Sequence, residues 1–223
     1  MININEIFDN NQDVAKDVCL WLGNDSDSVE LAGAAEYMVE MHIPMVSLKP
    51  EFVPIVWPWI EKSNIKIMAR FDNLTVDNMS KLAVDVNSVF KQGADGAQLF
   101  LKLSELKRFA DSVENVRDDL FFNKDLSVAL DIFEIWPLDW ADVFSALKKL
   151  RATSLLLIMT HDDMDKSDFT GRIYAALENW DSDASMSLHV MLDESYKRAE
   201  QVYRLVAINR PELLNKLKFF VSY

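Results

Sequence analysis

The fold of this chain is decided by residues 44–71, which read PMVSLKPEFVPIVWPWIEKSNIKIMARF. An apolar run, Pro44–Leu48, is followed over Glu51–Lys62 by apolar side chains at helical spacing and then by a second apolar run, Ile65–Phe71. Short, continuous apolar runs are typical of parallel strands buried on both faces, and two parallel strands need a crossover between them. Pro58 lies inside the helical stretch and predicts a kink or an early end there. These residues therefore predict a strand–helix–strand unit.

The same alternation repeats along the chain. Helical stripes follow the later apolar runs, for example over residues 75–90, where Thr75 is a good N-cap, and over 106–120 and 169–180. The predicted strands are Val18–Gly23, Pro44–Leu48, Ile65–Phe71, Ala97–Leu101, Leu126–Ile132, Ser154–Thr160, Met186–Leu192 and Leu217–Tyr223. Eight such repeats favour a closed (β/α)8 TIM barrel over an open sheet. Because the eighth predicted strand ends at Tyr223, we expect the barrel to lack the usual final helix.

A single barrel domain is expected over residues 1–223, because no linker or low-complexity segment interrupts the series. Residues 1–13 precede the first strand and are expected to form a cap segment over the bottom of the barrel. Without a final helix, the flank between the first and seventh helices is open. We therefore expect a homo-oligomer in which a partner subunit covers this flank.

Composition limits the classes of partner. Lys and Arg total 23 against 36 for Asp and Glu, so the formal net charge is −13. Such a surface repels nucleic-acid backbones and anionic lipid, and no apolar window approaches the ~20 residues of a membrane span. Cys19 is the one cysteine, the N-terminus lacks a secretory signal, and the five glycines form no nucleotide-binding motif. We expect a cytoplasmic protein with no cofactor, no nucleic-acid partner and no membrane partner.

Polar side chains collect on the predicted inward faces near the C-terminal ends of the strands, where barrel enzymes have their sites. They are Ser47 and Lys49, Arg70 and Asp72, Gln98 and Lys102, Ser127 and Asp131, and His189 and Asp193. Polar groups inside a doubly buried sheet are costly unless they are paired or face a wet cavity. This convergence predicts a functional site, and its structural alternative is an ion-pair network that plugs the barrel mouth.

The turn before the fourth strand, Gly93-Ala94-Asp95-Gly96-Ala97, resembles the helix-to-strand turn of the aldolase-like barrels. Lys102 on the fourth strand is similar to the lysine arrangement of transaldolases. The sequence departs from other Schiff-base aldolases on the sixth strand, because Leu155–Thr160 carry no lysine.

The first predicted chemistry is a Schiff base formed by a barrel lysine. Lys102 is the preferred nucleophile, because Lys49 and Arg70 are placed to favour its neutral amine, and Lys49 could exchange roles with it. Asp131 or His189 would move protons. The predicted substrate-binding residues are Arg70, which would hold a carboxylate, Asp72, Gln98, Ser47 and Asp193. The resulting function is a carbon–carbon lyase or dehydratase acting on a small oxo-acid or aldehyde.

Two alternatives stay open. In one, His189, Asp193 and His161 ligate a divalent metal in a lyase, isomerase or hydrolase. In the other, a non-catalytic barrel binds a metabolite or a partner through the same mouth. An open pocket that reaches Lys102 and Lys49 would favour the lysine chemistry.

Overall fold

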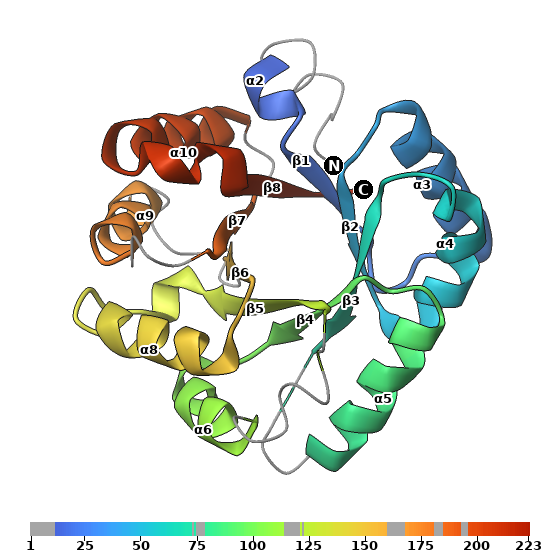
Figure 1. Cartoon of the computed structure of the whole chain (residues 1–223). Coiled ribbons are helices and arrows are strands. Elements are labelled where there is room, and N and C mark those ends of the chain that lie inside the picture. Colours follow the sequence, from blue (N-terminus) through green and yellow to red (C-terminus); the bar gives the residue numbers. More distant parts are fainter. Residues whose placement is uncertain are drawn as a thin grey trace.

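The computed structural model describes residues 12–72, 74, 79–113, 121, 123–159, 168–180, 185–192 and 196–223. Eight parallel strands pair in chain order and close into a barrel, with the helices outside it (Figure 1). The strands are β1 (Val18–Trp21), β2 (Met45–Leu48), β3 (Lys66–Phe71), β4 (Gly96–Phe100), β5 (Asp125–Asp131), β6 (Ser154–Ile158), β7 (Ser187–Met191) and β8 (Leu217–Ser222). The predicted TIM barrel is confirmed, and every strand end lies within two residues of its predicted position.

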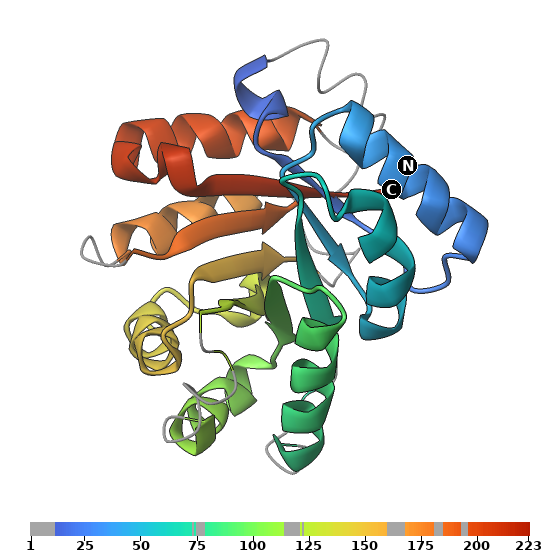
Figure 2. The same ribbon diagram turned by 45° about the vertical axis from the view of Figure 1, so that its right-hand side comes forward.

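Helices follow the strands and cover the outside of the barrel, as the turned view shows (Figure 2). The α-helices are α2 (Gln12–Ala15), α3 (Ser28–Glu40), α4 (Val53–Ile60), α5 (Met79–Lys91), α6 (Leu103–Val113), α8 (Trp140–Leu150), α9 (Asp168–Glu178) and α10 (Tyr196–Asn209). The 3-10 turns are η1 (Pro50–Phe52), η3 (Ile132–Glu134) and η4 (Pro211–Lys216). In the part of the chain that the structure describes, no helix has the length and apolarity to cross a membrane.

The predicted helix over Glu51–Lys62 is shorter than expected. η1 occupies its beginning, and α4 runs through Pro58 and ends at Ile60. Proline cannot donate a backbone hydrogen bond to the carbonyl four residues earlier, which weakens the helix at this point. The helix nevertheless continues for two residues past Pro58, so the predicted break at this proline is not found.

The barrel is closed by pairing between its first and last strands. Val18 of β1 lies opposite Phe219 of β8, and Trp21 lies opposite Ser222. β8 also pairs with β7, so this final strand has a neighbour on each side. The strand that the sequence placed last is therefore an integral part of the sheet.

Side chains alternate between two cores, as predicted. Outward residues such as Val46, Leu99 and Val190 belong to the large apolar layer between strands and helices. Inward residues form a smaller cluster of Cys19, Ala129, Leu156 and Phe220, against which Trp21, Met45, Phe100, Ile158 and Met191 pack. The inside of the barrel is therefore filled largely by apolar and aromatic groups.

Several predictions fall on residues outside the described part of the chain. They concern the cap segment up to residue 11, the N-cap at Thr75, and the two metal-ligand candidates His161 and Asp193. The described chain resumes after residue 167 with α9, where Asp168 in the first turn pairs with Arg172 at 2.6 Å.

Candidate functional site

A cavity of about 290 Å³ opens beside the C-terminal ends of β2 and β3. Its charged lining residues are Lys49, Glu51, Arg70, Asp72, Lys81 and Asp85. Lys49 directly follows β2, Asp72 directly follows β3, and Lys81 and Asp85 come from α5. The cavity therefore lies at the end of the barrel where the sites of this fold are built.

Arg70 is the most deeply buried of the charged residues at this cavity. Its side chain is 1% exposed, and its guanidinium lies 3.9 Å from the centre of the Trp21 ring. Nη2 donates hydrogen bonds to the Leu22 carbonyl oxygen at 3.1 Å and to Asn24 Oδ1 at 2.5 Å. Among the described residues, the buried Nε and Nη1 have no hydrogen-bond partner, and the nearest carboxylate oxygen, on Asp72, is 3.9 Å from Nε. A guanidinium held in this way has spare donors for an anionic group.

Burial lowers the pKa of Arg70, because desolvation disfavours the cation. The carboxylates of Asp72 and Glu51 oppose this effect, since negative charge nearby favours the protonated form. A bound anion would act in the same direction as these two carboxylates.

Lys49 lies at the same cavity on a fixed turn. It is the N-cap of η1, and Pro50 at the first position of that turn restricts the backbone that carries it. Its side chain is 28% exposed, and its Nζ lies 3.8 Å from Glu51 Oε1. The structure thus brings Lys49, Arg70 and Asp72 together, three of the residues named from the sequence.

Two other predicted binding residues, Ser47 and Gln98, are fully buried inside the barrel. Ser47 Oγ donates to Gln98 Oε1 at 2.7 Å, and Gln98 Nε2 lies 3.5 Å from Ser127 Oγ. These contacts connect β2, β4 and β5 across the interior. They satisfy polar groups that would otherwise be costly to bury, which is a structural role.

Lys102 and Asp131 lie apart from the cavity. Lys102 follows β4 and is exposed, and neither of the two cavities described for this barrel includes it in its lining. Asp131 is 6% exposed, and its Oδ1 accepts a 2.8 Å hydrogen bond from the Phe133 backbone N–H at the start of η3. Of these two cavities, the first reaches Lys49, and neither reaches Lys102.

His189 points inward from β7 and lines a different cavity, at the end of the barrel where the strands begin. It is 4% exposed, and burial lowers its pKa to about 3, with the positive charges of Lys218 and Lys66 adding to the effect. Of its predicted metal-ligand partners, His161 and Asp193 are not among the described residues. Within those residues, no group of three or more His, Cys, Asp or Glu side chains is placed to hold a metal ion.

Sequence reasoning missed several residues of the site. Trp21 could have been found, because it alternates with Cys19 on the inward face of β1. Asn24 lies in the loop after β1, and Lys81 and Asp85 lie on the first turns of a helix, so strand alternation says nothing about them.

No protein-family profile and no curated protein matches this sequence. Solved structures do match. A proposed deoxyribose-phosphate aldolase from Toxoplasma gondii ME49 is 14% identical over 99% of this chain and 93% of that chain, with a TM-score of 0.72. The tetrameric deoxyribose phosphate aldolase from Aeropyrum pernix is 11% identical over 98% and 91%, also with a TM-score of 0.72. The chain has an aldolase-like fold.

That likeness concerns the fold alone. A proposed copper homeostasis protein CutC from Streptococcus agalactiae, 11% identical over 92% of this chain and 97% of that chain, also matches, with a TM-score of 0.64. Because one fold hosts several functions, the function has to be argued from the side chains of the site.

Proposed function

We propose that this barrel is an aldolase-type lyase or dehydratase for a small oxo-acid, with Lys49 as the reactive amine and Arg70 as the group that binds the carboxylate. The observation that carries this proposal is the buried Arg70 guanidinium, which has two nitrogens without a partner among the described residues and belongs to a cavity that Lys49 also lines. Arginine is suited to carboxylates because its planar group offers several fixed donors.

The reaction begins with attack of the Lys49 amine on the substrate carbonyl. The carbon–nitrogen bond forms, the carbonyl oxygen leaves as water, and an iminium ion remains. Asp72, at the same cavity, accepts the proton of the substrate β-hydroxyl. The electron pair of the broken carbon–carbon bond then moves to the iminium nitrogen, an aldehyde leaves, and protonation and hydrolysis of the enamine regenerate Lys49.

This assignment changes the roles expected from the sequence. Lys49 takes the place of Lys102, because the cavity reaches Lys49. Asp72 takes the place of Asp131 and His189, which do not line this cavity. Arg70 keeps the role expected for it.

Intact-mass analysis after borohydride reduction with pyruvate and other small oxo-acids tests the proposal. We expect a reduced adduct on Lys49 that is absent from Lys49→Met and retained in Lys102→Met, the matched control. An adduct on Lys102 would restore the role expected from the sequence and refute the assignment to Lys49.

The second candidate is a non-catalytic barrel that binds a small carboxylate at the same cavity. The ion pair between Lys49 and Glu51 favours it, because a paired ammonium group is a poor nucleophile. Pyruvate binding that is lost in Arg70→Met, without any adduct on a lysine, would select this candidate over the lyase.

A further inference from the structure

A second cavity, of about 540 Å³, lies at the end of the barrel where the strands begin, opposite the mouth with Lys49 and Arg70. It is lined by the first residues of several strands, among them Lys66 of β3, Ser154 of β6 and Ser187 of β7, and it extends to His189. We propose that this cavity is a second ligand site, which binds a small molecule carrying a phosphate group. It is separate from the proposed lyase site.

The cavity exists because small residues replace the bulky ones that normally fill a barrel at this level. Ser154 and Ser187, which begin β6 and β7, are the small residues of its lining. A volume of this size is within the range of small-molecule sites, roughly 300–1,000 Å³.

Three lysines line this cavity, Lys66, Lys216 and Lys218. Lys66 Nζ donates to Asp125 Oδ2 and Lys218 Nζ donates to Asp17 Oδ1, both at 2.6 Å. These two ion pairs position the ammonium groups, and each ammonium keeps two further donors for a ligand. Three cations against two carboxylates leave a local positive excess in a chain of net charge −13.

His189 supplies an independent indication of a ligand. It is 4% exposed, and its Nδ1 has no hydrogen-bond partner in the part of the chain that the structure describes. Leaving a buried polar atom without a partner costs about 1–3 kcal/mol, and a turn of the imidazole that brings this nitrogen to a polar group bound in the cavity would remove this cost. The hydroxyl groups of Ser154 and Ser187 lie on the same lining.

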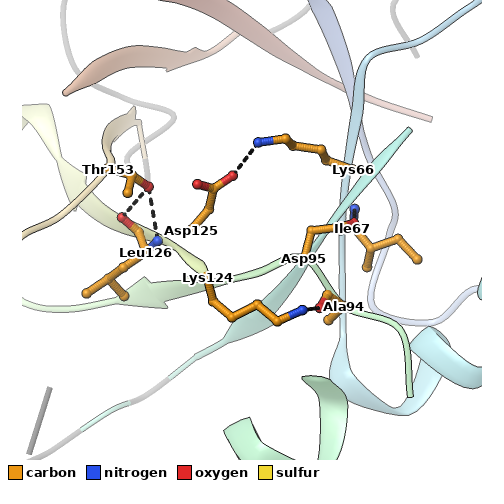
Figure 3. A network of polar contacts seen from close by, with 8 residues as sticks. All are labelled: Lys66, Ile67, Ala94, Asp95, Lys124, Asp125, Leu126 and Thr153. Atoms are coloured by element: carbon orange, nitrogen blue, oxygen red, sulfur yellow. Dashed lines mark hydrogen bonds and ion pairs between the residues drawn. The ribbon is translucent and has the colours of Figure 1, made fainter. Parts of the chain in front are cut away.

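The wall of the cavity is held by hydrogen bonds between neighbouring strand entries (Figure 3). One contact is the ion pair between Lys66 and Asp125. In another, the Ile67 backbone N–H donates a hydrogen bond to Asp95 Oδ2 at 2.9 Å. The other contacts of this network are Lys124 Nζ to the Ala94 carbonyl oxygen at 2.8 Å, the Leu126 N–H to Thr153 Oγ1 at 3.0 Å, and Thr153 Oγ1 to the Leu126 carbonyl oxygen at 3.1 Å. Ligand groups on such a frame are positioned before binding, which reduces the entropy lost when a ligand is ordered.

The chemistry favours phosphate over carboxylate at this end of the barrel. The cationic lining consists of lysines without an arginine, and lysines bind phosphate as mobile point charges. The mouth cavity differs, because a fixed arginine belongs to its lining. The two ends of the barrel therefore present different anion-binding groups.

Titration calorimetry with inorganic phosphate and with glycerol 3-phosphate, at constant ionic strength, tests the proposal. We expect glycerol 3-phosphate to bind more tightly than inorganic phosphate. Lys216→Met and Lys66→Met should each weaken binding about tenfold, which corresponds to about 1.4 kcal/mol. Lys107→Met removes the same charge from the surface of α6, and we expect it to leave binding unchanged.

Two further measurements assign the binding to this end of the barrel. The imidazole NMR signals of His189, identified by their loss in His189→Gln, should shift on titration with glycerol 3-phosphate, and Arg70→Met should retain the binding. If Lys66→Met does not fold, Lys216→Met decides, since Lys216 is partly exposed and makes no ion pair with a described residue.

Three results would overturn the proposal. The first is that neither phosphate probe binds. The second is binding of glycerol 3-phosphate that Arg70→Met abolishes and Lys216→Met preserves. The third is equal affinity for inorganic phosphate and glycerol 3-phosphate, which would mean that the cavity recognises only the ion.

Discussion

The protonation of His189 predicts a loss of stability in mild acid. Burial lowers its folded-state pKa to about 3, whereas an unfolded chain has a histidine pKa near 6.5. Between these two values the unfolded chain binds one proton that the folded barrel does not, so the free energy of unfolding falls as the pH falls. The contribution is fully present above pH 6.5 and is lost progressively below it.

The size of the effect follows from the two pKa values. Each pH unit within the window is worth about 1.36 kcal/mol, so His189 alone lowers the free energy of unfolding by about 2 kcal/mol between pH 7 and pH 5. Ordinary carboxyl groups titrate near pH 4 and contribute little over this range. For a domain of this size the change corresponds to a fall in Tm of about 4–8 °C.

Urea unfolding at pH 7 and pH 5 measures the effect in the wild-type chain and in His189→Gln. The variant has no group that titrates at this position and should lose about 2 kcal/mol less than the wild type. His42→Asn is the matched control, because His42 is exposed and has a positive φ of 55°, which asparagine also tolerates. Equal pH dependence in the wild type and His189→Gln, or an NMR pKa near 6.5 for His189, would refute the reasoning.

Four other predictions concern the fold. Cys19 is buried and desolvation raises its pKa to about 12, so we expect no reaction with a thiol reagent in the native protein and full reaction in urea, followed by absorbance. Gly93→Ala should lower the free energy of unfolding by about 2–4 kcal/mol in denaturant titrations, because φ is 112° and an added Cβ would overlap the Trp57 ring, whereas little change would contradict this geometry. Asp27→Ala should cost about 1 kcal/mol in the same assay, since its carboxylate caps α3, and Asp27→Ser should recover most of the loss. Light scattering after gel filtration should give a mass above 25.6 kDa if a partner subunit covers the flank between α3 and α10, and a monomer would reject that expectation.

The barrel could be predicted because its determinants are local. The run Ser154–Thr160 and the stripe after it each have a length and a period that allow one kind of element, and eight repeats leave few ways to arrange them. Alternation also placed Arg70 and Gln98 correctly on inward faces. Alternation alone could not tell that Gln98 satisfies other buried groups while Arg70 keeps unpartnered donors, since that depends on three-dimensional packing.

The candidate site was predicted in part for a related reason. Lys49 and Lys102 both lie within two residues of the end of a strand, and they differ in what surrounds them in space. Pro50 and α5 enclose the first, whereas the second is exposed at the start of α6. His189 was expected near the C-terminal ends of the strands, but it lines the cavity at the opposite end of the barrel. Its position along the barrel axis depends on the stagger between strands, which a single sequence does not show.

The pairing of β1 with β8 has a consequence for synthesis on the ribosome. Val18 and Phe219 face each other in the sheet although some 200 positions separate them, and the ion pair of Asp17 with Lys218 spans 201. A nascent chain therefore displays two open sheet edges, on β1 and on β7, until Leu217–Ser222 has left the exit tunnel. Exposed edges of this kind invite pairing with other chains, so newly made protein should depend on chaperones during this interval more than the completed barrel does.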